Sequence, residues 1–302
     1  MNNSFVKTYF QSSILAKLIV INIGVFLLIS VADVLFYLFG MQGYMEYLSV
    51  KFLALPANLE TLAFRFYTPL TYMFLHTDFW HIFANMLWLI CIKQFLESIL
   101  NNRQLLGVYI LGGLSGAFMY VFSYNVFPVF ENSLATSVCL GASAAVTAYI
   151  ILIAVLQPEY RVLFFGIIPM TFKWIAIAYV IFDVFQLTGD NAGGHFAHLG
   201  GAIFGLVFAL QLKKGRDITQ GFNNLVDKIV SVFSFSGVKQ HKTKMRVTYN
   251  ERKENNNVTK SRQESSVEDR KRMDEILKKI SQSGYDNLTK EEKAFLFKMS
   301  GK

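Results

Sequence analysis

The sequence predicts an all-α membrane protein, in which six transmembrane helices are followed by a helical cytoplasmic tail. Of its 302 residues, 53% are hydrophobic and only 17% are charged, whereas charged residues make up roughly 25% of ordinary soluble domains. Apolar runs of about 20 residues, the length that crosses a bilayer, recur through the first 212 residues. Residues 1–212 contain eight Lys/Arg and nine Asp/Glu, while residues 213–302 contain 21 and 12. A basic tail of this kind predicts contact with anionic lipids rather than with nucleic acid.

The apolar segments define the six predicted membrane helices. The first includes Leu18–Gly40, which is too long for a signal peptide and has no small-residue cleavage site near its end, so we expect it to remain in the protein. The fourth segment is short, and Phe164–Met170 blurs the start of the fifth. The predicted helices span residues 15–40, 79–100, 104–124, 141–157, 170–188 and 194–212.

The connections between these helices predict the orientation. Residues 41–78, between the first two helices, mix aromatic and charged residues, which is typical of a loop in the membrane interface. With a cytoplasmic N-terminus, only Lys51 and Arg65 lie outside. The inner side then receives Lys7, Arg103, Arg161, Lys213, Lys214 and Arg216. Because basic residues favour the cytoplasmic side, both termini should be cytoplasmic in a multi-pass protein, which we expect in a bacterial inner membrane.

The tail is expected to contain three kinds of segment. Apolar residues at helical spacing predict an amphipathic helix on the inner leaflet. A polar stretch rich in Asn, Lys, Glu and Ser predicts a flexible linker. Two short helices follow, and the capping box Thr289-x-x-Glu292 opens the second. These segments are the amphipathic helix 221–233, the linker 239–264 and the helices 267–282 and 290–300.

Polar residues inside membrane helices are costly and indicate function. His81 and Asn85 lie on the second predicted helix, Ser143 lies near the start of the fourth, and His198 lies on the sixth. These three helices run from outside to inside, and each residue falls within the first turns of its helix. The topology therefore places all four residues at a similar depth near the outer side.

Small residues provide a reason for two of these helices to meet. Gly201 and Gly205 form a GxxxG pair on the same helix face as His198. The fourth helix offers a complementary small face of Gly141, Ala144, Ala145 and Ala148. Close contact would bring Ser143 within reach of His198, and a serine beside a base is an activated nucleophile. The positive N-terminal end of the fourth helix would favour an oxyanion, to which His81 and Asn85 could also donate.

These motifs resemble those of the rhomboid intramembrane serine proteases. The resemblance covers about residues 15–212. It includes Glu97, which follows the motif of His76, His81 and Asn85 on the second predicted helix. It implies a rhomboid-like bundle in which Ser143 and His198 form a catalytic dyad, with His81, Asn85 and Gly141 lining the oxyanion site. It also implies substrates that are single-pass transmembrane proteins, cut near the ends of their helices. The matching motifs are Gly141-Ala142-Ser143, Ala197-His198-x-x-Gly201-x-x-x-Gly205 and His76-x-x-x-x-His81-x-x-x-Asn85.

The sequence departs from the family pattern at three places. The family often has glycine after the serine, where this chain has Ala144. It often has an aromatic residue four positions after the serine, packed under the histidine, where this chain has Thr147. It usually has glycine shortly before the glutamate, where this chain has Lys93 and Gln94. The first two departures affect the seating of His198 but remove no reacting group.

Other polar residues are interpreted as structural. His76 and His195 flank the site without an assigned part, and Glu97 and Arg103 should tie down the inner loop. Asp183 could orient His198 as a third member of a triad, although a structural hydrogen bond is the preferred interpretation.

Two rival functions remain open. A metal or haem protein could use His76, His81, His195 and His198, which fall at one membrane level, but the chain lacks the HExxH motif of metalloproteases. A catalytically inactive relative could bind membrane proteins without cutting them, although such a protein usually lacks a nucleophile or base. The favoured prediction is a serine protease that needs no cofactor and no metal.

Overall fold

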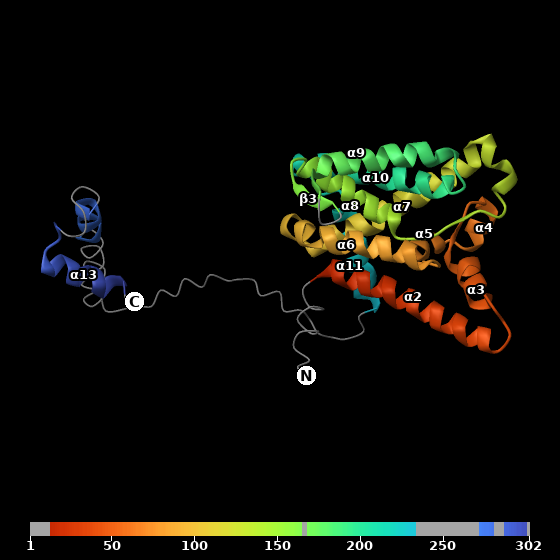
Figure 1. Ribbon diagram of the computed structural model, residues 1–302, viewed down its shortest axis with the longest axis horizontal. Helices are drawn as coiled ribbons and strands as arrows, with labels where there is room; N and C mark the ends of the chain where they lie inside the picture. The colour runs from red at the N-terminus through yellow and green to blue at the C-terminus, as the bar shows by residue number, and fades with distance from the viewer. Residues whose placement is uncertain (1–12, 165–167, 234–271, 281–286, 301–302) are drawn as a thin grey trace. The chain divides into compact units, whose positions relative to one another are not determined.

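A computed structural model describes residues 13–164, 168–233, 272–280 and 287–300 of the chain. Residues 13–233 belong to one compact unit, and the helices near the C-terminus belong to a second. The first unit is built almost entirely from helices, apart from two short two-stranded sheets (Figure 1). The structure is that of an all-α membrane bundle, as the sequence predicts.

Six helices correspond to the six predicted membrane segments. Ser13 caps the first by accepting a hydrogen bond from the Ala16 N–H, Asp78 caps the second, and Asn101 and Gln104 form a capping box at the third. The six are α2 (Ile14–Leu38), α6 (Phe79–Ile99), α7 (Asn102–Val126), α8 (Ser143–Leu156), α9 (Phe172–Phe185) and α10 (Ala192–Lys213).

Among the described residues, four of these helices are long and apolar enough to cross a membrane, namely α2, α6, α7 and α10. The helices α8 and α9 have 14 residues each. At roughly 1.5 Å per residue, such a helix is about 21 Å long and falls short of a hydrocarbon core of about 30 Å. Every residue from Ala144 to Ile153 of α8 is buried, and α8 contacts α6, α7, α9 and α10. The short helix is therefore the core of the bundle rather than a lipid-facing span.

The expected boundaries of the fifth helix were wrong at its start. A β-hairpin of β3 (Arg161–Phe164) and β4 (Ile168–Thr171) occupies the segment before α9, with Arg161 opposite Thr171. Of the apolar residues that blur the helix start in the sequence, Phe164 and residues 168–170 are therefore strand residues. At its other end, the 3₁₀ turn η3 (Gln186–Thr188) continues α9 to the predicted end.

The connection between α2 and α6 is helical rather than a simple loop. Its exposed aromatic side chains include Phe64 and Phe66, at 87% and 79% exposure. The strands β1 and β2 pair antiparallel, with Leu55 opposite Cys139, and so join this connection to the segment before α8. The elements are α3 (Tyr44–Leu53), β1 (Leu55–Pro56), α4 (Leu59–Phe64), α5 (Thr68–Thr71) and η1 (Tyr72–Phe74), with η2 (Pro128–Ser133) and β2 (Val138–Cys139) after α7.

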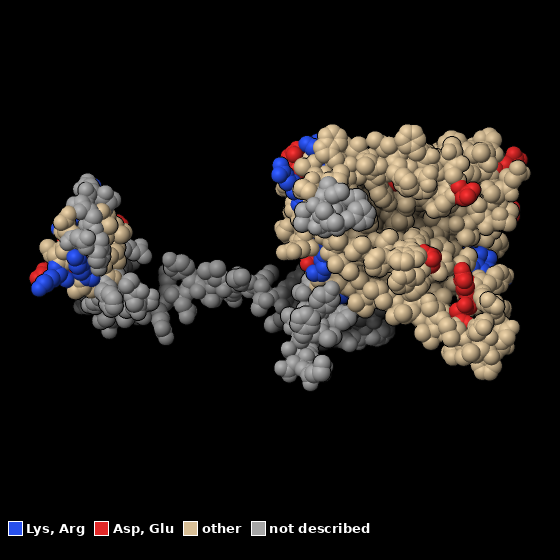
Figure 2. Space-filling view, in the orientation of Figure 1, with Lys and Arg blue, Asp and Glu red and all other residues tan. Residues whose placement is uncertain are grey.

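The predicted amphipathic helix is α11 (Gln220–Phe233), which packs against α7. Arg103 and Asp227 form an ion pair of 2.9 Å, and the Thr219 side chain fills the space that a side chain at Gly107 would need. The row of Leu225, Ile229 and Val230 is exposed. Figure 2 shows charged side chains gathered toward the ends of the bundle, with a broad face of other residues between them.

In the second unit, residues 272–280 are helical and α13 spans Lys290–Ser300. The predicted capping box is present, since the Thr289 hydroxyl accepts from the Glu292 N–H and the Glu292 carboxylate accepts from the Thr289 N–H. Lys279 pairs with Glu292 at 2.9 Å. The predicted linker, residues 239–264, and the outer parts of the predicted helix 267–282 lie outside the described residues.

Candidate active site

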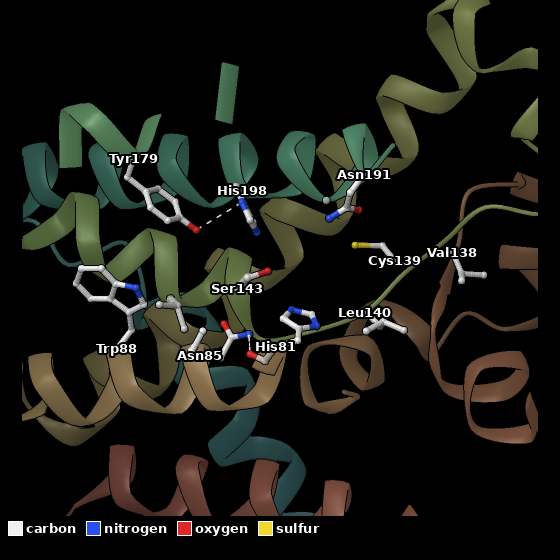
Figure 3. A pocket seen from close by; sticks show the side chains of 13 residues that line it. His81, Asn85, Trp88, Val138, Cys139, Leu140, Ser143, Tyr179, Asn191 and His198 are labelled. Carbon is white, nitrogen blue, oxygen red and sulfur yellow. Dashed lines mark hydrogen bonds between the residues drawn. The ribbon is translucent and has the colours of Figure 1, made fainter. Parts of the chain in front are cut away.

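A cavity of about 390 Å³ lies among α6, α8, α9 and α10 (Figure 3). His81 and Asn85 reach it from α6, Ser143 from α8 and His198 from α10. The structure thus brings together the four polar residues that the topology placed at one depth. The remaining lining side chains are mainly apolar, apart from Tyr179 and Asn191, so a few polar groups would orient a substrate.

The turn before α8 depends on Gly141. Its φ is +111°, and an added Cβ would lie 2.6 Å from the His81 ring, so both the backbone conformation and the close approach favour glycine. The next residue, Ala142, donates its N–H to Nε2 of His76 at 3.3 Å. Burial lowers the pKa of His76 to about 3, which keeps the imidazole neutral and able to accept. These contacts fix the loop that ends at Ser143.

Ser143 is the first residue of α8, where backbone N–H groups lack intrahelical acceptors and favour negative charge. In Figure 3 its hydroxyl and the His198 imidazole point toward each other across the cavity. Within the described part of the chain the two groups form no hydrogen bond. Such contacts often tighten only when a substrate is bound, so the geometry suits a nucleophile and its base.

Cys139 is a second nucleophilic side chain in the cavity lining. Burial raises the pKa of its thiol to about 12. Because the thiolate is the reactive form, this cysteine is a poor competitor for Ser143 near neutral pH.

The glycine pair of α10 sets the distance between α10 and α8. A Cβ added to Gly201 would lie 2.0 Å from the Ala144 carbonyl oxygen, and one added to Gly205 would lie 2.2 Å from that of Ala148. The predicted contact between the small-residue faces is confirmed. It holds His198, on the same helix, opposite Ser143.

A buried carboxylate contacts the other side of the His198 ring. Asp183, on α9, is 1% exposed, and its Oδ1 lies 2.8 Å from Nδ1 of His198. The same oxygen lies 2.7 Å from Nδ1 of His195. The hydrogen bond that the sequence suggested for Asp183 is therefore present, and it is shared between two histidines.

The amide of Asn85 is already engaged. Its Nδ2 donates to the His81 carbonyl at 2.9 Å and lies 3.4 Å from Nε2 of His76. A role in holding an oxyanion would therefore require the amide to turn partly toward the cavity. The buried His76 has a clear structural part, since it accepts from the loop before Ser143.

Two of the departures from the family pattern are accommodated by other residues. The Ala144 methyl group packs against Gly116, which has no side chain. A Cβ added to Gly116 would lie only 2.4 Å from the Cβ of Ala144. In place of an aromatic residue at position 147, the ring of Tyr179 lies 5.8 Å from the His198 ring, and the Thr147 hydroxyl is 3.3 Å from the Tyr179 oxygen.

The third departure lies toward the C-terminal end of α6, away from the cavity. Lys93 forms an ion pair of 2.9 Å with Glu97, which also accepts a hydrogen bond from Ser13. The Ser13–Glu97 hydrogen bond connects α2 to α6 and the Arg103–Asp227 pair connects α7 to α11, and neither Glu97 nor Asp227 is part of the cavity lining.

The four histidines of the metal hypothesis fall into two pairs in ring contact, His76 with His81 and His195 with His198. In the described residues, the group able to offer three ligand atoms to a metal is Asp183, His195 and His198. The distances from Oδ1 of Asp183 to Nδ1 of His195 and His198 are 2.7 and 2.8 Å, which are hydrogen-bond lengths. An N–H···O hydrogen bond therefore explains each contact without a metal ion.

Tyr179 is the site residue that sequence reasoning missed. A tyrosine in an apolar helix is usually part of the packing, so its type gave no indication. The sequence did contain one indication of its role. Tyr179 and Asp183 are four residues apart, which puts both side chains on one face of α9.

The comparisons with known proteins agree with the fold. The family model for the Rhomboid domain matches residues 63–215, from the connection before α6 to the end of α10. No curated protein matches the chain. The matched region contains the whole cavity and each of the residues described around it. The chain is therefore an integral membrane protein of the rhomboid family, a family of intramembrane proteases.

Proposed function

We propose that this rhomboid is an active serine endopeptidase that cuts single-pass transmembrane proteins. The observation that carries the proposal is the shared cavity of Ser143 and His198, whose side chains point toward each other. The Ser143 oxygen attacks the scissile carbonyl carbon, and the serine proton passes to Nε2 of His198. The same proton then passes to the leaving amine, and water releases the acyl group by the reverse sequence.

The oxyanion of each tetrahedral intermediate needs hydrogen-bond donors. The Ser143 backbone N–H lies at the start of α8, and His81 and Asn85 line the same cavity. We assign these groups to the oxyanion. One donor of this kind typically contributes about 10²–10³ in rate, roughly 2.7–4 kcal/mol, so we expect the loss of either side chain to be milder than the loss of Ser143.

The alternative that deserves a direct test is metal-dependent hydrolysis at the group of Asp183, His195 and His198. We expect the purified protein to cut a single-pass test substrate at full rate after treatment with a strong chelator. The physical reason is that a serine–histidine pair needs no Lewis acid. A rate that falls on chelation and returns with zinc or iron would support the metal hypothesis instead.

The second alternative is an inactive rhomboid that only binds membrane proteins. It would retain the test substrate without producing fragments, under conditions in which the active protein releases two. Measurement of fragments by mass spectrometry separates the two, because binding alone leaves the substrate mass unchanged.

We propose a cytoplasmic N-terminus, in keeping with the basic residues on the inner side, and residence in a bacterial inner membrane with lipids as its surroundings. Arg103 lies in the first turn of α7 and Glu131 lies beyond its other end, in η2. In a protein without its native cysteines, an impermeant thiol reagent on whole cells should label a cysteine at position 131 and spare one at position 103. The reverse pattern would invert the topology and place the cavity near the cytoplasmic side.

A further inference from the structure

Asp183 is a carboxylate buried among apolar membrane helices, where a charge is costly unless it is paired. Its Oδ1 is within hydrogen-bond distance of Nδ1 of both His195 and His198. An ionised carboxylate can only accept, so each Nδ1 carries the hydrogen. A neutral imidazole with its hydrogen on Nδ1 has an unprotonated Nε2, and in Figure 3 the second ring nitrogen of His198 points toward Ser143.

We infer that Asp183 is a positioning residue that holds His198 in the tautomer and orientation needed to act as a base, so that the site is a Ser143–His198–Asp183 triad. This inference rests on the proposed protease function. It assigns to α9 a task in the chemistry, in addition to its place in the bundle.

The neighbouring side chains hold the same ring. Tyr179 lies one helical turn before Asp183 on α9, with its oxygen 3.5 Å from Nδ1 of His198. The Thr147 hydroxyl, 3.3 Å from the Tyr179 oxygen, donates to the Ser143 carbonyl at 2.8 Å. One face of α9 thus supplies both the acceptor for His198 and the aromatic ring beside it, and Thr147 connects this face to the serine.

The carboxylate also matters during the reaction. When the serine proton moves to Nε2, His198 becomes a cation in a poorly solvated site, and Asp183 at 2.8 Å stabilises that cation while taking up no proton. The electron pair of the serine oxygen forms the new bond to carbon, and the carbonyl π pair moves to the oxyanion. The leaving amine later removes the proton from Nε2, which restores the starting tautomer.

His195 provides a matched control within the same cluster. It offers the same atom to the same carboxylate oxygen at nearly the same distance, but it does not line the cavity. If Asp183 only pins α9 to α10, the loss of His195 should be about as harmful as the loss of Asp183. If Asp183 positions His198, the two losses should differ greatly.

The test compares Asp183→Asn with His195→Ala, using cleavage of a test substrate in detergent. An asparagine amide can donate to Nδ1 and favour the wrong tautomer, so Asp183→Asn should lower kcat by about 10²–10⁴-fold with KM nearly unchanged. His195→Ala should retain kcat close to wild type. The unfolding midpoint of each variant shows whether the fold is kept.

The pH profile separates positioning from packing. The titratable groups around His198 are Asp183 and Tyr179 from α9, His195 from α10 and His81 from α6. Only the charge at position 183 changes in Asp183→Asn. That anion faces the cation that His198 becomes during the reaction, so its loss should shift the pH dependence of kcat/KM, whereas a change in packing alone should not.

An Asp183→Asn protein that is folded, with wild-type kcat and an unshifted profile, would overturn the inference. Equal losses in Asp183→Asn and His195→Ala with unshifted profiles would also overturn it. If Asp183→Asn does not fold, the ¹⁵N spectrum of wild-type imidazole decides, because neutral His198 must carry its proton on Nδ1. Failure of the proposed function looks different, since either the wild-type protein would release no fragments or Ser143→Ala would still cut.

Discussion

Replacement of Ser143 by alanine is expected to abolish detectable cleavage in a folded protein. Among the described residues that line the cavity there is no other serine or threonine, and burial keeps the Cys139 thiol protonated. His198→Ala should be nearly as severe, because a serine hydroxyl is a weak nucleophile without a base. The double variant should lose little more than either single one, because residues that act as one unit are strongly non-additive. Initial rates of fragment release measure all three.

A matched serine variant distinguishes loss of chemistry from loss of structure. Ser98 is exposed near the other end of α6, where its hydroxyl donates to the Phe95 carbonyl. Ser98→Ala should therefore cut at the wild-type rate. A folded Ser143→Ala protein that cuts nearly as well as wild type would refute the mechanism.

The second large effect is expected at the glycine face of α10. In Gly201→Val the new side chain would meet the Ala144 carbonyl, from which even an added Cβ would be only 2.0 Å away. Overpacking of this kind costs about 1–3 kcal/mol, and sometimes more. If the protein folds, α10 must shift away from α8, and a displacement of about 1 Å at reacting groups can cost 10²-fold in rate. We expect a lower unfolding midpoint and a loss of most activity.

Gly24 on α2 offers the control, since an added Cβ there would meet nothing within 4 Å. Gly24→Val should leave the rate unchanged. If Gly201→Val kept both its midpoint and its rate, the close contact between α8 and α10 would not be what positions His198.

The sequence predicted the parts of this site that have a chemical signature. Ser143, His198, His81 and Asn85 stand out because polar groups inside membrane helices are expensive. The glycine pair indicated which helices approach closely, and the structure places Gly201 against Ala144. These features depend on residue type and spacing, so one sequence is enough to find them.

The features that the sequence did not predict depend on contacts between distant segments. Apolar strands and apolar helices look alike in composition, so the predicted start of the fifth helix, residue 170, lies inside β4 rather than in α9. Nothing in the sequence says that one oxygen of Asp183 accepts from two histidines. Nor does the sequence say that the Tyr179 ring lies beside His198. In the family pattern an aromatic residue at the position of Thr147 often packs there instead. The sequence shows that the fourth segment is short, but it does not show that other helices surround α8.

The most direct test of a serine nucleophile in this rhomboid is to treat the purified protein with a serine-reactive fluorophosphonate and to map the adduct by mass spectrometry. Reaction requires a serine oxygen activated by a base, so the label should be found on Ser143 alone. It should be absent from Ser143→Ala and strongly reduced in His198→Ala. Cleavage by wild-type protein that continues without any adduct on Ser143, or with the adduct on another serine, would contradict the account.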